Sequence, residues 1–266
     1  MKILSAILLS SAFLSAHTFA SPRTPGNWVL NKNFSDEFEG NIKPFWRKDS
    51  YVTTGYVWTG KEGFWYFTPR SKNIRVENGE LVISAYKDYY MPPGETEVRP
   101  WSSGIITHSN TVKYGYFEAR YKSAPCSLNS AFWLSDVPSK TEGQYELDVQ
   151  ESRGTGCWLG DSHRPNAHQH RQNIHWGPTP QVLGQNIETV YRTYSAHWTP
   201  TSISYHFNNR STPGFVFNHN WMRAPMRLKL SVGVFGDVTG ARGTPSNVPV
   251  DGGTMRVKWI RTWQEQ

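Results

Sequence analysis

The chain has 266 residues, with 28 Lys and Arg against 21 Asp and Glu, and a formal net charge of +7. The basic residues are scattered, without a Lys/Arg run or a recognised nucleic-acid motif, so we expect no nucleic-acid partner. Twelve Trp and thirteen Tyr are present. Because sugar rings stack on aromatic faces, this composition together with the positive charge favours an anionic polysaccharide as partner.

The first 20 residues have the pattern of a secretory signal peptide. Lys2 is followed by an apolar run from Ile3 to Leu14, and Thr18-Phe19-Ala20 forms a small-residue cleavage site. We therefore expect residues 1–20 to be removed, residues 21–266 to form a single domain, and the protein to be secreted or periplasmic. No other stretch is apolar enough to span a membrane, and a monomer is the default expectation.

The rest of the chain is rich in strand signals and contains no long amphipathic helix. In Arg227–Val234, leucine and valine occupy every second position, which is typical of a strand with one buried face. Clusters of Gly, Pro and Asn separate such segments. The predicted strands are Leu81–Tyr86, Tyr114–Lys122, Ser130–Leu134, Ile203–Phe207, Arg227–Val234 and Met255–Trp263. This pattern predicts an all-β protein, an antiparallel β-sandwich of the jelly-roll kind.

A further predicted strand, Glu146-Leu147-Asp148-Val149-Gln150-Glu151, carries three carboxylates. Side chains alternate along a strand, so Glu146 and Asp148 share a face, whereas Glu151 has the opposite parity. A one-residue β-bulge at Val149 or Gln150 restores the parity and places all three acids on one face. The two Glu side chains can then approach to about 5 Å, as in a retaining glycosidase pair. The alternative is a charged edge strand, which the core-like sequence of the flanking segments disfavours.

Six motifs follow one another in order from about Asn33 to Gln264. They are Asn78–Leu81, Tyr114–Arg120, Ala131–Leu134, Glu146–Glu151, Ser195–Pro200 and Trp259–Trp263. In sequence and order this set resembles glycoside hydrolase family 16. The resemblance implies a jelly-roll sandwich with a concave carbohydrate-binding cleft, and cleavage of internal β-glycosidic bonds with retention. By position in the motif, Glu146 is the nucleophile, Glu151 is the acid/base, and Asp148 tunes Glu146.

The spacing of the acids and an upstream segment indicate a branch of this family. The two residues between Asp148 and Glu151 resemble the bulged motif of laminarinases, agarases, porphyranases and carrageenases. Trp58-Thr59-Gly60-Lys61 resembles the Trp-x-Gly-Arg segment that lines the negative subsites of agarases and porphyranases, with Lys61 in place of Arg. A hydrophobic loop with a solvated lysine is the alternative for this segment.

The resemblance therefore implies an endo-β-galactanase acting on β-1,4 bonds of an agar-type red-algal galactan, porphyran or agarose. The net positive charge favours a sulfated chain. The alternatives are a carrageenan or furcellaran hydrolase, a laminarinase of the same family, and a non-catalytic glycan-binding β-sandwich. The three acids argue against the last of these, because a binding protein has no need of two such glutamates together.

Five further residues are candidates for substrate binding. Trp133 resembles the family's stacking residue beside the cleavage point. Trp65 and Trp101 are candidates for the same role, with a place in the hydrophobic core as the alternative. Arg153 is a candidate for contacting a sulfate or hydroxyl on the leaving-group side, with an exposed surface arginine as the alternative. His175 resembles the family's histidine on the strand after the catalytic one, and we expect it to hydrogen-bond substrate.

We expect no metal and no other cofactor. His168, His170 and His175 lack the fourth ligand or adjacent carboxylate of a zinc site, so a metal there is the weaker interpretation, and we expect His168 and His170 in a loop. Many family members carry a structural calcium ion, with an Asp of the last strand as ligand. Lys258 stands at that position here, and its ammonium can take the place of the cation.

Cys126 and Cys157 are the only two cysteines. Export to an oxidising compartment permits a bridge between them. If Ser130–Leu134 and Glu146–Glu151 pair as antiparallel neighbours, the two cysteines lie opposite one another. We therefore expect a disulfide that fixes the loop beyond the acid-bearing strand, with two buried thiols as the alternative.

Overall fold

The computed structural model describes residues 22, 25–49, 51–52, 65–96, 98–125, 128–136, 145–153, 162–163, 165–169, 174–177, 181–182, 187–208, 210–234 and 252–266. Within these ranges the protein consists of strands and one short 3-10 helix, which confirms the predicted all-β fold. No helix in them is long and apolar enough to cross a membrane.

The elements in chain order are β1 (Trp28–Leu30), η1 (Lys32–Phe34), β2 (Trp46–Lys48), β3 (Tyr51–Val52), β4 (Trp65–Phe67), β5 (Ile74–Val76), β6 (Leu81–Tyr90), β7 (Arg99–Ser103), β8 (Ile105–His108), β9 (Gly115–Lys122), β10 (Leu128–Ser135), β11 (Tyr145–Arg153), β12 (Ser162–His163), β13 (Asn166–Gln169), β14 (Ile174–Trp176), β15 (Gln181–Val182), β16 (Arg192–Trp198), β17 (Ser202–Phe207), β18 (Arg210–Asn218), β19 (Arg227–Val234) and β20 (Gly252–Glu265).

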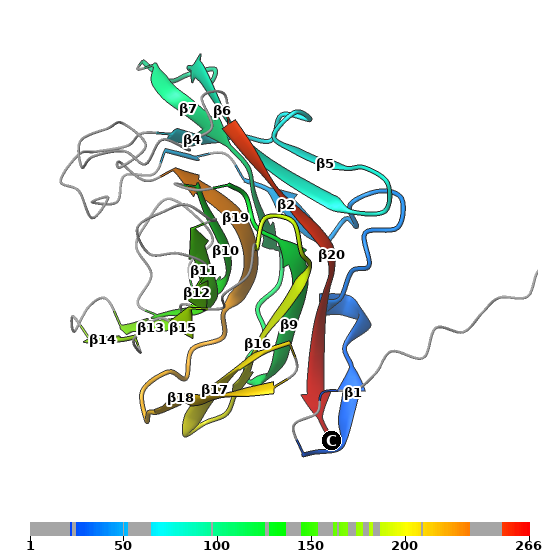
Figure 1. Ribbon diagram of the computed structural model, residues 1–266, viewed down its shortest axis with the longest axis vertical. Coiled ribbons are helices and arrows are strands. Elements are labelled where there is room, and N and C mark those ends of the chain that lie inside the picture. The colour runs from blue at the N-terminus through cyan, green and yellow to red at the C-terminus, as the bar shows by residue number, and fades with distance from the viewer. Residues whose placement is uncertain are drawn as a thin grey trace, which may run out of the picture.

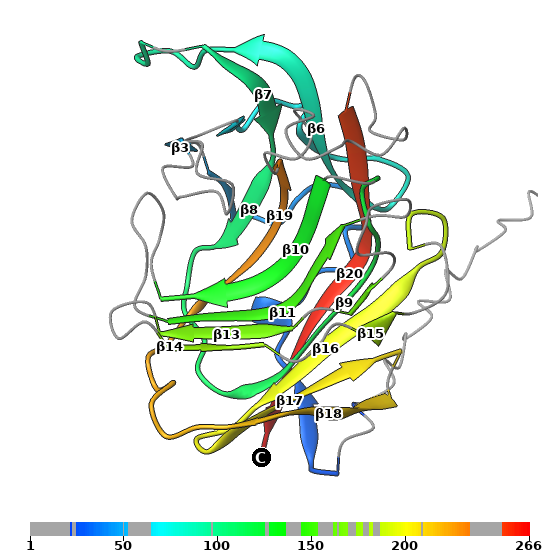
Figure 2. The same ribbon diagram turned by 60° about the vertical axis from the view of Figure 1, so that its left-hand side comes forward.

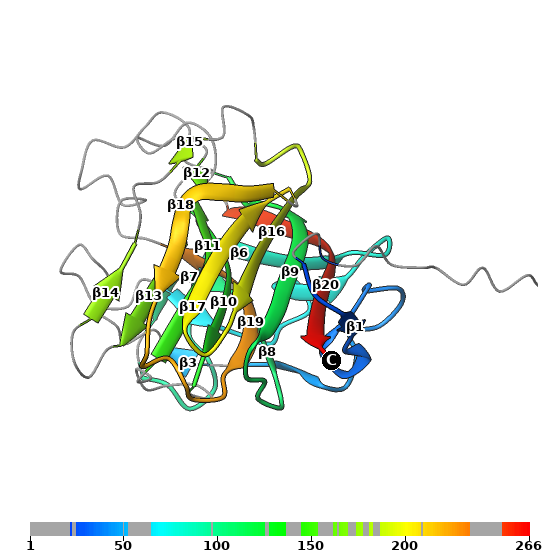
Figure 3. The ribbon, with the colours of Figure 1, turned by 90° about the horizontal axis from the view of Figure 1, so that it is seen from below.

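Two large sheets pack face to face (Figure 1). The larger has the order β18-β17-β16-β9-β20-β6-β7-β4-β3, with β1 beside β20 and β5 beside β6. The smaller has the order β14-β13-β11-β10-β19-β8-β2. Figure 2 shows β10, β11, β13 and β14 side by side, and Figure 3 shows β16, β17 and β18 continuing the larger sheet beyond β9. Strand β11, which carries the three acids, therefore lies within the smaller sheet, with β10 on one side and β13 and β14 on the other.

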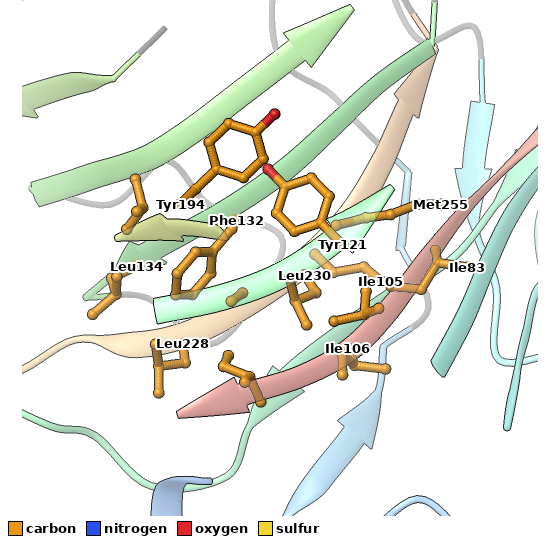
Figure 4. Close-up of a cluster of buried hydrophobic side chains, with 14 of the residues drawn as sticks. Ile83, Ile105, Ile106, Tyr121, Phe132, Leu134, Tyr194, Leu228, Leu230 and Met255 are labelled. Carbon is orange, nitrogen blue, oxygen red and sulfur yellow. The ribbon is translucent and has the colours of Figure 1, made fainter. Parts of the chain in front are cut away.

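Apolar side chains from both sheets meet between them and form the main core (Figure 4). Phe132 and Leu134 of β10 and Leu228 and Leu230 of β19 are fully buried, as the alternating sequence predicts. Burying one such side chain contributes about 1.5–3 kcal/mol. Because this packing occupies one face of the smaller sheet, residues of the opposite parity lie on its other face.

All six predicted strands are present, and β19 has the predicted bounds. Of the others, β6, β10 and β20 extend by three or more residues beyond their predicted bounds. The first half of β20 pairs with β6 and the second half with β9 and β1. Pairing of β6 with β7, and of the two ends of β20 with β6 and β1, therefore extends these strands beyond their predicted bounds.

The hairpin between β5 and β6 shows how one of the motifs fixes local structure. Glu77 and Glu80 exchange backbone hydrogen bonds, and Asn78 and Gly79 turn the chain with φ angles of 55° and 69°. Positive φ at both central residues is characteristic of a tight two-residue hairpin turn, for which Asn-Gly is the favoured sequence. The motif thereby places Glu80 directly before the return strand β6.

Candidate active site

The three acids lie on one face of β11 because the strand contains the predicted bulge. Asp148 pairs with Trp133 and Gln150 with the adjacent Phe132, so Val149 is the extra residue. Val149 and Gln150 are both fully buried on the core side. We call the opposite side of the smaller sheet, with Glu146, Asp148 and Glu151, the acid face. The predicted bulge is therefore confirmed, and so is the antiparallel pairing of the two strands.

Strand β11 is an internal strand, since it pairs with β10 on one side and β13 on the other. The alternative of a charged edge strand is therefore wrong. An internal strand has its backbone hydrogen bonds satisfied on both sides, which fixes the directions of its side chains better than an edge does. A site that requires carboxylates in defined positions gains from this placement.

The acids differ in their surroundings. Asp148 is only 4% exposed, whereas Glu146 and Glu151 are partly exposed. The Asn129 side-chain amide donates a hydrogen bond to Glu151 Oε1 at 2.8 Å. Asn129 belongs to β10 and lies two residues before Ala131, which is opposite Glu151. No sequence signal points to Asn129, and only the register of β10 against β11 reveals its place beside Glu151.

Trp133 lies opposite Asp148 with its ring partly exposed on the acid face. Its indole Nε1 donates to Ser231 Oγ at 3.1 Å, and the Lys229 ammonium is 4.3 Å from a centroid of its ring system. These two contacts from β19 fix the orientation of the indole. The position agrees with the prediction of a stacking residue beside the acids, and its role stays a prediction.

Trp65 and Trp101 pair with one another across β4 and β7, and both belong to the main core. They are 7% and 4% exposed. Rings with so little open surface act as core side chains, which corrects the expectation that they stack on sugars. The burial of both rings supports the alternative, a place in the hydrophobic core.

The histidine prediction also needs correction. The strand next to β11 is β13, in which His168 lies directly opposite Glu146. His175 belongs to β14, one strand further out, where it pairs with His168. Strand β13 is short and polar and carries no strand signal, so the sequence predicts His168 in a loop and His175 on the strand beside the acids. Within the described residues no group of three or more potential ligands could hold a metal ion.

Four of the predicted residues lie outside the described ranges, namely Trp58, Lys61, Cys126 and Cys157, as do His170 and the expected signal peptide. Arg153 ends β11 opposite Asn129, and the structure gives only its backbone position. The same holds for His168 and His175.

Lys258, predicted to replace a bound cation, makes an ion pair in the larger sheet. Its Nζ is 2.7 Å from Glu80 Oε1 and 5.1 Å from the centroid of the Tyr191 ring. Arg256 reaches the other carboxylate oxygen of Glu80 at 3.3 Å. Two basic side chains thus compensate the Glu80 carboxylate that the Asn78–Leu81 motif places there.

Comparison with known proteins identifies the family. Residues 28–265 match the family model described as Beta-porphyranase A-D, GH16 domain. Beta-porphyranase E of Zobellia galactanivorans is 27% identical over 189 residues, which cover 64% of this chain but only 63% of that protein. Beta-porphyranase B of the same organism is 25% identical over 274 residues, 91% of this chain and 87% of that protein.

The crystal structure of that porphyranase B has the same fold, with a TM-score of 0.72 at 21% identity over 92% of this chain and 96% of that chain. Both comparisons and the ordered motifs thus agree with the jelly-roll architecture. The chain belongs to glycoside hydrolase family 16, as its match to the beta-porphyranase A-D model of that family over residues 28–265 shows.

Proposed function

We propose that this protein is a secreted, retaining endo-β-galactanase that cleaves internal β-1,4-galactosidic bonds of an agar-type red-algal galactan, porphyran or agarose. The observation that carries the proposal is the bulge in β11, which brings Glu146, Asp148 and Glu151 onto one face of an internal strand beside Trp133. A retaining glycosidase needs two carboxyl groups on the same side of its substrate, and the partly exposed Trp133 ring beside them offers a surface on which a sugar can stack.

The chemistry assigns a role to each acid. The Glu146 carboxylate attacks the anomeric carbon while the glycosidic C–O bond breaks, and Glu151 gives its proton to the leaving oxygen. A water molecule then loses a proton to Glu151 and attacks the same carbon, which releases Glu146 and the second product. Asp148, buried between the two on the same face, orients Glu146 and adjusts its charge.

The matches to beta-porphyranases support a galactan rather than a glucan as substrate. The net charge of +7 supports a sulfated one. We propose that Trp133 stacks on a sugar ring beside the cleavage point, with Trp58 and Lys61 on the glycone side and Arg153 and His175 as further polar contacts. The apolar segment ending at Ala20 supports secretion.

The substrate is tested by reducing-end release from agarose, porphyran, κ-carrageenan, furcellaran, laminarin and mixed-linkage β-glucan. We expect activity on porphyran or agarose. Activity only on a carrageenan, furcellaran or a glucan would contradict the assignment of an agar-type galactan as substrate. Binding without activity on any of the six polysaccharides would support the glycan-binding alternative. The anomer formed first, followed by NMR, tests retention: the β-anomer is expected, and the α-anomer would contradict the roles of the two glutamates.

Asn129→Ala tests how Glu151 is held. The variant loses the 2.8 Å hydrogen bond to Glu151 Oε1. This bond is worth most when Glu151 becomes charged on giving up its proton, because a hydrogen bond to a charged group contributes about 1.5–3 kcal/mol. We expect kcat to fall about 10- to 100-fold with little change in KM. Asn129→Asp is the matched control, since it keeps the shape and puts a second carboxyl beside Glu151. Its activity should recover as the pH is lowered, and an unchanged kcat in both variants would exclude the contact from catalysis.

A further inference from the structure

Lys229 is a buried lysine in the middle of the acid face. It lies in β19 opposite Trp133, which is itself opposite Asp148, so the three residues form one row across the sheet. Its side chain is only 2% exposed. Lysine is almost never so buried unless a partner compensates its charge.

The ammonium group has two neutral contacts. Nζ donates to Ser135 Oγ at 2.8 Å and lies 4.3 Å from the centroid of the Trp133 ring system. Ser135 is directly opposite Glu146 on β11. Lys229 therefore extends from its own row toward the row of Glu146. No carboxylate of the described residues is in ion-pair contact with it, so its charge is compensated at longer range.

The charges around Lys229 come from three elements. Burial lowers the pKa of Lys229 to about 8, whereas Glu146 and Asp49 favour its charged form, and Arg227 and Arg47 oppose it. Asp49 already pairs with Arg47 at 3.3 Å. The groups that face Lys229 from β10 and β8, Ser135, Trp133 and Thr107, carry no charge. Of the two acids that favour the charged form of Lys229, Glu146 has the larger effect, and it lies opposite Ser135, the residue that the ammonium contacts.

We propose that Lys229 is a positioning residue of the site: its ammonium, held between Ser135 and the Trp133 ring, stabilises the negative charge of Glu146 and fixes the indole beside the acids. The inference rests on the proposed role of Glu146 as nucleophile. Electrostatic coupling is reciprocal, so the charge that keeps Lys229 protonated also favours an ionised Glu146. When Glu146 leaves the glycosyl intermediate, its returning negative charge meets the same cation.

The test is a titration of Glu146 by NMR in protein labelled with 13C at the Glu side-chain carboxyls. The Glu146 signal is the one missing from Glu146→Gln. We expect Lys229→Met, which is close in volume, to raise the pKa of Glu146 by about one pH unit. Lys229→Arg keeps the charge and should titrate like the wild type. Lys32→Met, which removes an exposed lysine of η1, is the control for net charge. An unchanged Glu146 titration in Lys229→Met would overturn the proposal.

This measurement needs no turnover, so a protein inactive on every galactan would refute the proposed function without refuting the coupling. With an active protein, the acid limb of the kcat/KM profile should move with the Glu146 titration, whereas a purely structural role would lower kcat/KM equally at every pH. If Lys229→Met does not fold, the reciprocal experiment remains. Glu146→Gln changes a partly exposed residue and should lower the pKa of Lys229 below its wild-type value, and an unchanged Lys229 titration would equally overturn the proposal.

Discussion

Glu146→Gln is expected to reduce reducing-end release by at least about 10⁴-fold while leaving galactan binding intact. The amide keeps the size of the carboxylate but cannot attack the anomeric carbon. The two glutamates should differ in how their loss is rescued. Azide added to Glu146→Ala attacks from the face that the carboxylate leaves open and gives an α-glycosyl azide. Added to Glu151→Ala, it attacks the glycosyl intermediate and gives the β-glycosyl azide.

The measurement is the anomeric configuration of the azide product by NMR, with binding followed by isothermal calorimetry on the same galactan. Glu95→Gln, an exposed carboxyl outside the acid face, is the control and should retain full activity. Wild-type turnover by Glu146→Gln, or the opposite pattern of azide products, would show that the acids have been assigned to the wrong roles.

The second large effect is on stability and comes from Glu118 in β9, on the outer face of the larger sheet. Its carboxyl is 4% exposed and accepts a hydrogen bond from Trp263 Nε1 at 2.8 Å. Burial raises the pKa of Glu118 from 4.5 to about 7. The unfolded chain ionises this group near pH 4.5, so the fold loses stability as the pH rises from there through about 7.

Glu118→Gln removes this dependence, because the amide stays neutral and its oxygen can still accept from Trp263. We expect the variant to exceed the wild type in free energy of unfolding by roughly 3 kcal/mol at pH 8, and the two to converge below pH 4.5. Urea unfolding at a series of pH values measures the difference. His206, whose pKa burial lowers to about 4, affects both proteins alike and cancels in the comparison. A difference that does not change with pH would contradict an ionising Glu118.

The sequence predicted the acid face because its signals are strong and local. Alternation along a strand gives the parity of Glu146, Asp148 and Glu151, and only a bulge reconciles them. Asn129 could not be found in this way, since its contact with Glu151 depends on the register between two strands. Trp65 and Trp101 show a different limit: an indole that stacks on a sugar and one that fills a core look the same in a sequence.

His175 was misplaced for a third reason, because β13 is short and polar and carries no strand signal. Lys229 alternates with the leucines and valines of Arg227–Val234, so its parity places it on the polar face of its strand. The polar face of β19 lies on the acid face of the smaller sheet, where Lys229 is buried. Only the order of the strands in the sheet shows that this face is part of the candidate active site.

The bulge at Val149 also bears on how such sites change during evolution. On its two sides the pairs Asp148 with Trp133 and Gln150 with Phe132 follow one another without a gap on β10. Removing the codon for Val149 would leave every other pair in place and keep all three acids on the same face. Removing Leu147 instead would disrupt the pairing of β11 with β10, or move the residues on one side of the deletion to the opposite face of the sheet. One codon therefore separates the bulged strand of this protein from a regular strand with the same three acids on one face.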